Sequence, residues 1–232
     1  MNHNADSIRE GAVFLVNKPL RWTSFDLVNK IRYHLRKQFG LKKIKVGHAG
    51  TLDPLATGLM IICVGKKTKS IESFMGLDKC YDGIFQLGAI TPSYDLETKI
   101  SASAETSHIN PEMVQNAIEA FQGEIDQVPP QFSAIKKGGQ KAYESARAGK
   151  TLKLDPRPVI IHHFQAQLKA EAELHFNICC SKGTYIRSIA RDLGESLGCG
   201  AFLKKLRRTS IGPYHLKEAW ELEELLNALK LS

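Results

Sequence analysis

Apolar and polar positions follow two different periods along this chain, which predicts a mixture of strands and helices. A short apolar run at residues 12–16 predicts a buried strand, and the continuous apolar run at 59–64 predicts a central one. Residues 81–87 alternate with a period of two, as in a strand with one buried face. Two further strand-like runs between 158 and 181, separated by the polar segment 169–173, predict an antiparallel hairpin.

Helical spacing of apolar residues appears in four other segments. Thr23 offers a cap for the first of these helices and Gly40 a terminus, and Asn110-Pro111 is a strong start signal for the second. The four predicted helices lie at about 23–40, 110–123, 184–197 and 218–229. The connection 90–107 is polar, and we expect it to be exposed.

Strands and helices mix without the regular alternation of a doubly wound protein. We therefore predict an α+β fold with a mixed, mainly antiparallel sheet flanked by helices. At 232 residues the chain can bury a sizeable core. We expect a flexible N-terminus at 1–10 and one catalytic domain at 11–232.

The formal net charge of +8 favours a polyanionic partner, and nucleic acid is the commonest one. A merely basic surface is the alternative. Cations gather in three places, namely the first helix and the turn after it (Arg32, Arg36, Lys37, Lys42, Lys43, Lys45), the stretch 136–141 and the stretch 204–208. The first cluster is either a solvated helix end or a phosphate contact.

Five cysteines, an odd number without a CxxC unit, favour reduced and buried thiols over a disulfide scaffold or a zinc site. The longest apolar run, at 58–64, is far too short to cross a bilayer. The N-terminal segment lacks the apolar centre of a signal peptide. We therefore expect a cytoplasmic protein without a membrane segment.

The segment Gly47–Gly58 has three glycines and a proline in twelve residues, which predicts a loop with tight turns. Asp53 lies in it and is either a catalytic carboxylate or the cap of a turn. Tyr185 and Arg187 lie at a strand-to-helix junction. Arg187 could keep a buried carboxylate ionised or form a surface ion pair. Tyr81 and Tyr185 could each stack on a base or belong to the core.

A long, ordered set of motifs resembles the TruB-type tRNA pseudouridine-55 synthases, in the bacterial short form without a PUA domain. The resemblance covers about residues 11–216. It is carried by NKPLRWTSFD, GHAGTLDPLATGLMIICVGKKTK, KCYDG, VPPQFSAIKKGGQKAYESARAG and CSKGTYIRSIARDLGESLGCGAFLKKLRRTSIGPY.

The resemblance implies an enzyme that isomerises a uridine of the tRNA T loop after flipping the base out of its stack. It implies that Asp53 is the catalytic aspartate, that Tyr81 stacks on the uracil and that Arg187 pairs with Asp53. His48, Tyr185 and Leu206 would line the pocket, with Lys18 and Pro19 supporting the loop. No cofactor and no metal are expected, and the partner is tRNA, bound through its T arm by a monomer that needs no other protein.

Two positions depart from the family pattern. Phe132 stands where the family usually has tyrosine, which should cost at most a hydroxyl. The segment TPSYDLET lacks the usual aspartate after its first threonine, which leaves the roles of Asp95 and Glu97 open. Three roles are also open to Asp53, namely attack at C6 of the base, attack at the ribose carbon, and removal of a ribose proton.

Overall fold

The computed structural model describes residues 5–230 and divides the chain into two compact units. The first unit combines Met1–Tyr81 with Leu206–Ser232, and the second is Asp82–Lys205. The sequence patterns and the family resemblance predicted a single catalytic domain over 11–232. The strands β4 (Lys79–Leu87) and β12 (Ala201–Ile211) each run from one unit into the other.

The first unit is built around β3 (Ala56–Val64), the predicted central strand. β3 pairs antiparallel with β1 (Ala12–Lys18) and parallel with the second half of β12. Residues 58–64 are all buried, which explains why this strand reads as a continuous apolar run and does not alternate. Short strands complete this part, namely β2 (Val46–His48), β13 (Tyr214–His215) and β14 (Trp220–Glu221).

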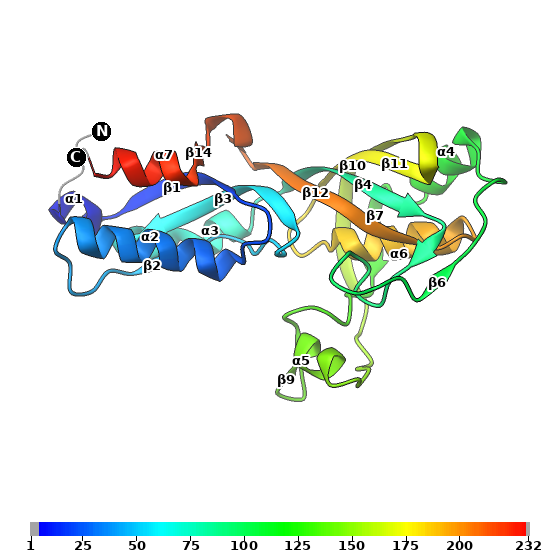
Figure 1. Cartoon of the computed structure of the whole chain (residues 1–232), viewed down its shortest axis with the longest axis horizontal. Helices are drawn as coiled ribbons and strands as arrows, with labels where there is room; N and C mark the ends of the chain where they lie inside the picture. The colour runs from blue at the N-terminus through cyan, green and yellow to red at the C-terminus, as the bar shows by residue number, and fades with distance from the viewer. Residues whose placement is uncertain (1–4, 231–232) are drawn as a thin grey trace. The chain divides into compact units, whose positions relative to one another are not determined.

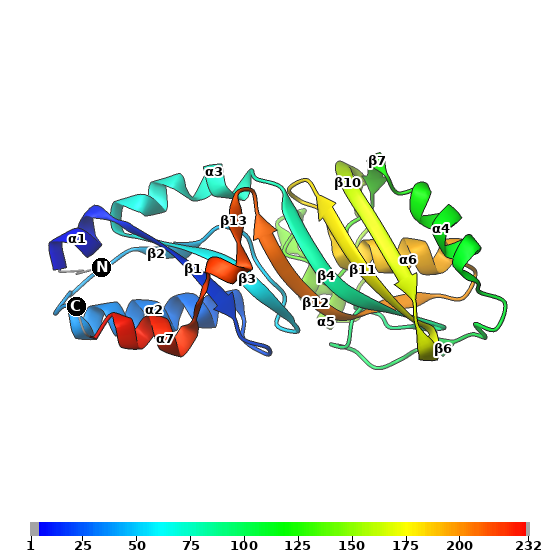
Figure 2. The same cartoon turned by 90° about the horizontal axis from the view of Figure 1, so that it is seen from above.

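The predicted first helix is α2 (Ser24–Gln38). Its N-cap Thr23 and Asp26 form a reciprocal capping box, and Gly40 follows the helix with a φ of 60°. Gln38 of α2 donates to the carbonyl of Lys230, just after α7, and both helices are visible in Figure 2. The other helices of this unit are α1 (Ala5–Glu10), η1 (Gly65–Ser70), α3 (Ile71–Met75), η3 (Leu216–Glu218) and α7 (Leu222–Ala228).

Two ends of the chain differ from the expectation. Residues 5–10, expected to be flexible, form α1, and the side chain of Ile8 is fully buried. Residues 1–4 of that expected segment lie outside the described residues. The terminal helix predicted from about Glu218 begins at Leu222, because residues 216–221 form η3 and β14.

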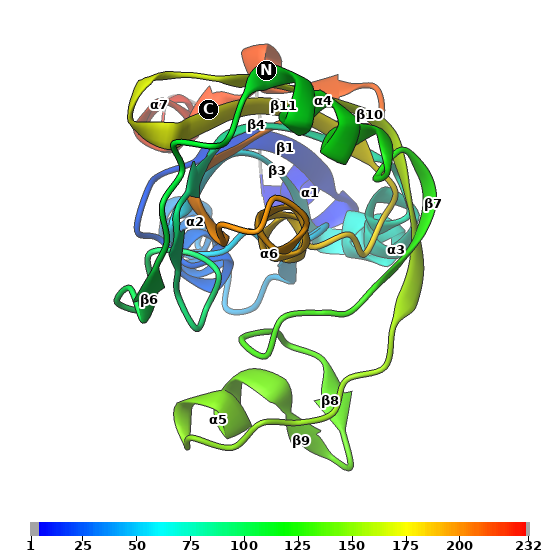
Figure 3. The ribbon, with the colours of Figure 1, turned by 90° about the vertical axis from the view of Figure 1, so that its right-hand side faces the viewer.

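The second unit contains the predicted hairpin, β10 (Arg157–Leu168) with β11 (Glu173–Cys180), and β7 (Gly123–Gln127) extends it. α6 (Ile186–Ser196) lies on the concave side of these curved strands (Figure 3). α4 (Pro111–Glu119) is capped by Asn110 as predicted, through a bond from the Met113 amide. A small sheet pairs β5 (Ala89–Ile90) with β6 (Ala102–Ser103).

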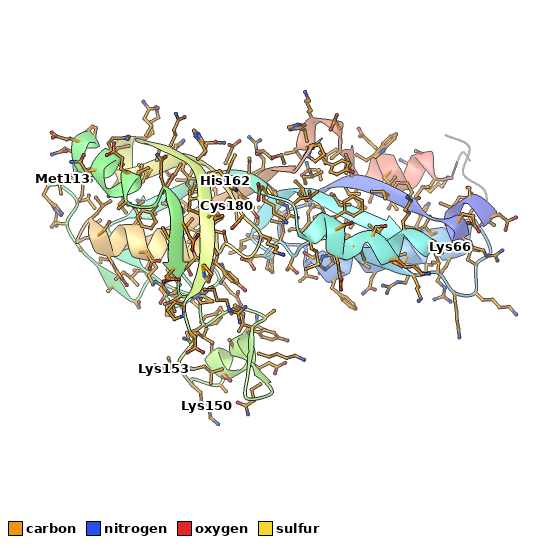
Figure 4. All side chains as sticks on the ribbon, turned by 180° about the vertical axis from the view of Figure 1, so that it is seen from behind. Lys66, Met113, Lys150, Lys153, His162 and Cys180 are labelled. Carbon is orange, nitrogen blue, oxygen red and sulfur yellow. The ribbon has the colours of Figure 1, made fainter. Side chains whose placement is uncertain are left out.

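Within the same unit, residues 136–147 extend away from the strands (Figure 1). They form the hairpin β8 (Lys136–Lys137) with β9 (Gln140–Lys141), followed by α5 (Ala142–Arg147). Lys150 and Lys153 lie on the same protruding part (Figure 4).

The main sheet has the strand order β14-β1-β3-β12-β4-β11-β10-β7, with β2 and β13 paired at its sides. Two of its pairs, β1 with β14 and β12 with β3, are parallel, and the other described pairs with printed register are antiparallel. The predicted fold class, a mixed and mainly antiparallel sheet flanked by helices, is confirmed.

Two other expectations are wrong. The connection 90–107 was expected to be exposed, but Thr91 and Ser93 have no exposed surface and Asp95 is 5% exposed. All three hydrogen-bond locally, and Ser93 and Asp95 also contact Arg187, as described below. The expectation of reduced thiols holds for Cys63, Cys180 and Cys199, whereas Cys80 and Cys179 are disulfide-bonded.

Gly58 is a position that only glycine fits, which gives a stability prediction. Its φ is +107°, and a Cβ there would overlap the backbone of Arg208 on the paired strand β12. Gly123 has a φ of +88° with open space around it, so Gly123→Ala measures the conformational strain alone. We expect Gly123→Ala to lower the free energy of unfolding by about 1 kcal/mol and Gly58→Ala by about 3 kcal/mol or more. Urea titration measures both, and equal losses would show that the strand contact carries no stability.

Candidate active site

Asp53 lies in the connection between β2 and β3, and its side chain is half-buried. Its carbonyl accepts a bond from the amide of Ala56 at 3.0 Å, so Asp53 sits on the last turn before β3 begins. We call residues 49–55 the Asp53 loop. Three buried side chains, Lys18, Ser24 and Arg208, hydrogen-bond to its backbone.

Ser24 holds the residue before Asp53. Its hydroxyl donates to the carbonyl of Leu52 at 3.0 Å and accepts from the amide of Leu52 at 2.9 Å. Ser24 is the first residue of α2 and is 4% exposed. The start of α2 is therefore tied directly to the Asp53 loop.

Lys18 and Arg21 hold the residue after Asp53. The Lys18 ammonium donates to the carbonyls of Pro19 at 2.9 Å, Trp22 at 2.7 Å and Pro54 at 3.4 Å. The amide of Arg21, whose φ is 66°, donates to the same Pro54 carbonyl at 2.8 Å. Lys18 thus supports the loop, as the family resemblance implies.

Arg208 holds the loop from the side of β12. Its guanidinium donates to the carbonyls of Leu59 at 2.7 Å, Gly50 at 3.2 Å and Thr51 at 3.4 Å. The residue is 1% exposed, and within the described residues it has no carboxylate partner. The close approach of β12 at Gly58 is what brings the guanidinium within reach of the loop.

The parallel register of β12 also places Leu206 beside Ala56, three residues after Asp53. His48 ends β2 and pairs with Ile62 of β3, on the other side of the loop. Tyr81, the last residue of the first unit, is 8% exposed on β4. His48 and Leu206 are therefore carried by strands that pair with β3, next to the Asp53 loop.

Burial and excess positive charge set the electrostatics of this region. Burial lowers the pKa of Lys18 from 10.5 to about 8, with the Asp53 carboxylate acting in the opposite direction and the Arg208 charge adding to the decrease. Burial and the Arg208 charge also lower the pKa of His48, so its imidazole is neutral at neutral pH. The Asp53 loop is therefore surrounded by the buried Arg208 guanidinium, the titratable Lys18 ammonium and the neutral His48 imidazole.

The two predicted site residues of the second unit lie together at the start of α6. Arg187 is 4% exposed and donates to the carbonyls of Phe132 at 3.0 Å and Ser93 at 3.2 Å. Its Nε lies 3.6 Å from a carboxylate oxygen of Asp95. Phe132 contributes its backbone to this contact, which either phenylalanine or tyrosine would supply.

Tyr185 is the N-cap residue of α6, and the side chain of Gln127 fixes its backbone. The Tyr185 amide donates to Gln127 at 2.8 Å, and the Gln127 amide nitrogen donates to the Tyr185 carbonyl at 3.2 Å. Asp95 and Glu97, left open by sequence, are also engaged. Asp95 accepts from the Glu97 amide at 2.9 Å, and the exposed carboxylate of Glu97 pairs with Arg147 at 2.7 Å.

Among residues 5–230 no group of histidine, cysteine, aspartate and glutamate side chains is arranged to hold a metal ion. No helix in the same range is both long and apolar enough to cross a membrane.

Two family models together match most of the chain. The TruB family pseudouridylate synthase N-terminal domain matches residues 36–186, and the tRNA pseudouridylate synthase B C-terminal domain matches 187–232. The chain belongs to the TruB family. It is therefore a pseudouridine synthase, which is an isomerase.

Relatives from bacteria are similar to this chain over nearly their whole length. A tRNA pseudouridine synthase B of Flavobacterium johnsoniae is 52% identical over 214 residues, covering 92% of this chain and 93% of that protein. One of Phocaeicola vulgatus is 50% identical over 217 residues, covering 94% and 92%. Both alignments span most of the length of each protein.

Solved structures support the fold. A chain of the crystal structure of a Cbf5-Nop10-Gar1 complex superposes with a TM-score of 0.71 and 25% identity. The superposition covers 95% of this chain and 54% of that chain, so this chain spans about half of it.

Lys18 was expected to support the Asp53 loop, whereas the supporting roles of Arg208, Ser24 and Gln127 were not predicted. Arg208 was counted only in a basic stretch and Ser24 only within the predicted first helix, yet both fix the Asp53 loop. Gln127 was not singled out at all. The alternation of side chains along a strand could have indicated that Arg208 is buried. Arg208 points to the opposite face from its neighbours, exposed Arg207 and half-buried Thr209.

Arg208→Lys tests whether the guanidinium positions the loop. A lysine ammonium cannot reach three carbonyls with the planar geometry of the guanidinium. We expect pseudouridine formation to slow by about 100-fold, because misplacing a reacting group by about 1 Å has an effect of that size. RNA affinity should stay within about threefold, since other contacts supply most of the binding. Arg207→Lys, at the exposed neighbouring position, is the control, and equal rates in the two variants would exclude the positioning role.

The pKa of Lys18 gives a pH prediction. As the pH rises through about 8 the ammonium loses a proton, and the loop loses a donor and the positive charge beside Asp53. The single-turnover rate of the wild type should therefore fall above this pH, with an inflection near the lowered pKa. Lys18→Met should be slower throughout and lack that inflection. An inflection that persists in Lys18→Met would assign it to another group.

Proposed function

We propose that this enzyme converts the uridine at position 55 in the T loop of tRNA to pseudouridine, with Asp53 as the catalytic carboxylate. The observation that supports this most is the fixed geometry of the Asp53 loop. Its backbone accepts bonds from Lys18, Ser24 and Arg208 on three sides, while the Asp53 carboxylate stays half-buried and within reach of solvent. The names of the relatives, tRNA pseudouridine synthase B, indicate the substrate class.

The reaction conserves every atom. The bond between N1 of uracil and the ribose carbon breaks, the base turns in place, and C5 joins the same carbon while C5 gives up its proton and N1 gains one. The target base must first leave its stack, which costs a few kcal/mol. Cationic contacts to the backbone and an aromatic contact to the base would offset this cost.

In this proposal His48, Tyr81 and Leu206 surround the uracil, with Tyr81 stacked on it. A neutral His48 suits that place, because an imidazole without charge can lie against a base at little desolvation cost. Tyr185 and Arg187 belong to the second unit, and their roles in the pocket, including the pair of Arg187 with Asp53, stay predictions. The proposed enzyme acts in the cytoplasm as a monomer and needs no cofactor.

Asp53→Asn tests the proposal directly. The change keeps the size of the side chain and removes its charge, so we expect the rate to fall by about 1,000-fold or more while tRNA affinity stays within a few fold. Carbodiimide labelling followed by primer extension locates pseudouridine in the RNA, since isomerisation changes no mass.

Asp126→Asn is the matched control, because Asp126 is exposed on β7. Product at a T-loop uridine with the wild type and the control, and none with Asp53→Asn, is the expected pattern. More than about a tenth of the wild-type rate in Asp53→Asn would contradict the catalytic role. Product at another position would contradict the T-loop assignment alone.

A further inference from the structure

The outer side of α2 and the turn after it carry cations that the proposed reaction at Asp53 does not use. From Leu27 to Leu52 the chain has seven lysines and arginines and no aspartate or glutamate. Five of these cations are exposed and lie at the end of α2 or just beyond it. We call them the α2 basic surface: Arg36, Lys37, Lys42, Lys43 and Lys45.

These five side chains have no ion pair and no hydrogen bond with any residue of the described range 5–230. Nearby Lys66, labelled in Figure 4, differs, because it pairs with Glu10 at 2.8 Å. Like charges gathered without partners repel one another, and an external polyanion would relieve that repulsion. The α2 basic surface therefore offers its full charge to a ligand.

Exposed aromatic rings accompany the cations on the same helix. Phe25 is 66% exposed and Tyr33 is 65% exposed, although rings of this size usually find cover. Positions 25, 29, 33 and 36 follow one side of a helix, so Tyr33 lies next to Arg36 along this stripe. Aromatic rings between cations are typical of surfaces that bind nucleic acid, where the rings contact bases or sugars and the cations contact phosphates.

The α2 basic surface lies far from Asp53 within the same unit, and two elements show how far. α2 starts at Ser24, which is bonded to the Asp53 loop, and its 15 residues extend about 22 Å. β3 starts three residues after Asp53, and at its other end Gly65 donates to the carbonyl of Lys45, about 26 Å along the strand. An RNA stem rises less per base pair than the roughly 3.4 Å of double-stranded DNA, so a T stem of about five base pairs is shorter than this spacing.

We propose that the α2 basic surface, with Tyr33, binds the sugar-phosphate backbone of the tRNA outside the T arm while the T loop lies at Asp53. This inference rests on the proposed function. It extends the contact with tRNA from the reacting loop to a second region of the same molecule. An acidic protein partner is the competing occupant, and the experiment below separates the two.

The test compares two triple variants that lose the same charge. Arg36→Glu/Lys42→Glu/Lys43→Glu changes the surface, and Lys99→Glu/Lys169→Glu/Lys217→Glu changes three exposed lysines elsewhere. Dissociation constants are measured for an unmodified whole tRNA and for its T-arm hairpin at several salt concentrations. Rates are measured at saturating tRNA, and thermal melting confirms that each variant is folded.

We expect the surface variant to bind whole tRNA about tenfold or more weakly than the control variant, with a salt slope smaller by about 2 to 3 because three phosphate contacts are lost. Hairpin affinity and the saturated rate should stay within about twofold of the control. Tyr33→Ala should weaken the affinity for whole tRNA about fivefold, because one stacking contact is lost. Its affinity for the hairpin should stay unchanged.

Whole-tRNA affinity within about twofold of the control variant would overturn the proposal and favour a protein partner. Equal losses for tRNA and hairpin would overturn it too, because the surface would then bind the T arm itself. A wild type that binds tRNA but modifies no T-loop uridine would refute the proposed function, while the binding comparison would still decide the role of the surface.

Discussion

The first unit depends on hydrogen bonds that fix the backbone of the Asp53 loop. The donors to its carbonyls are side chains of other segments. Lys18 and Arg208 are buried cations that donate to backbone carbonyls, and Ser24 adds a reciprocal pair of bonds. Bonds from charged donors are worth about 1.5 to 3 kcal/mol each, roughly twice a neutral bond. Burying these cations costs free energy, and their hydrogen bonds to the loop carbonyls offset that cost. Gly58 and the parallel pairing of β12 with β3 are needed because they bring Arg208 to the loop.

The same arrangement makes the surroundings of Asp53 electropositive. The Arg208 guanidinium is positive, burial lowers the pKa of Lys18 to about 8, and burial together with the Arg208 charge lowers the pKa of His48. Electropositive surroundings suit a polyanionic substrate, and the exposed cations at the end of α2 and beyond it extend this positive charge along the unit. In the second unit Arg187 is also a buried cation that donates to backbone carbonyls. It contacts two of these carbonyls and the carboxylate of Asp95.

Sequence patterns predicted the elements well where local physics decides them. The capping residues Thr23 and Asn110, the buried strand β3 and the β10–β11 hairpin follow from periodicity and turn chemistry. The connection 90–107 did not, because Thr91, Ser93 and Asp95 are polar residues buried by contacts with segments distant in sequence. The motif singled out Asp53, whose catalytic role stays a prediction. The positions of Arg208 and Gln127 depend on strand register and helix placement, which one sequence does not encode locally.

The most direct test of the loop support is hydrogen exchange, because it reports backbone opening without relying on activity. Peptides covering residues 46–58 would be compared in the wild type and in Arg208→Lys, with the α7 segment as an internal reference. Losing about 1.4 kcal/mol of support corresponds to tenfold faster opening. We predict exchange in the Asp53 loop to be about tenfold faster or more in the variant, with α7 unchanged. Equal exchange in both proteins would contradict the conclusion that the buried Arg208 guanidinium holds the Asp53 loop in place.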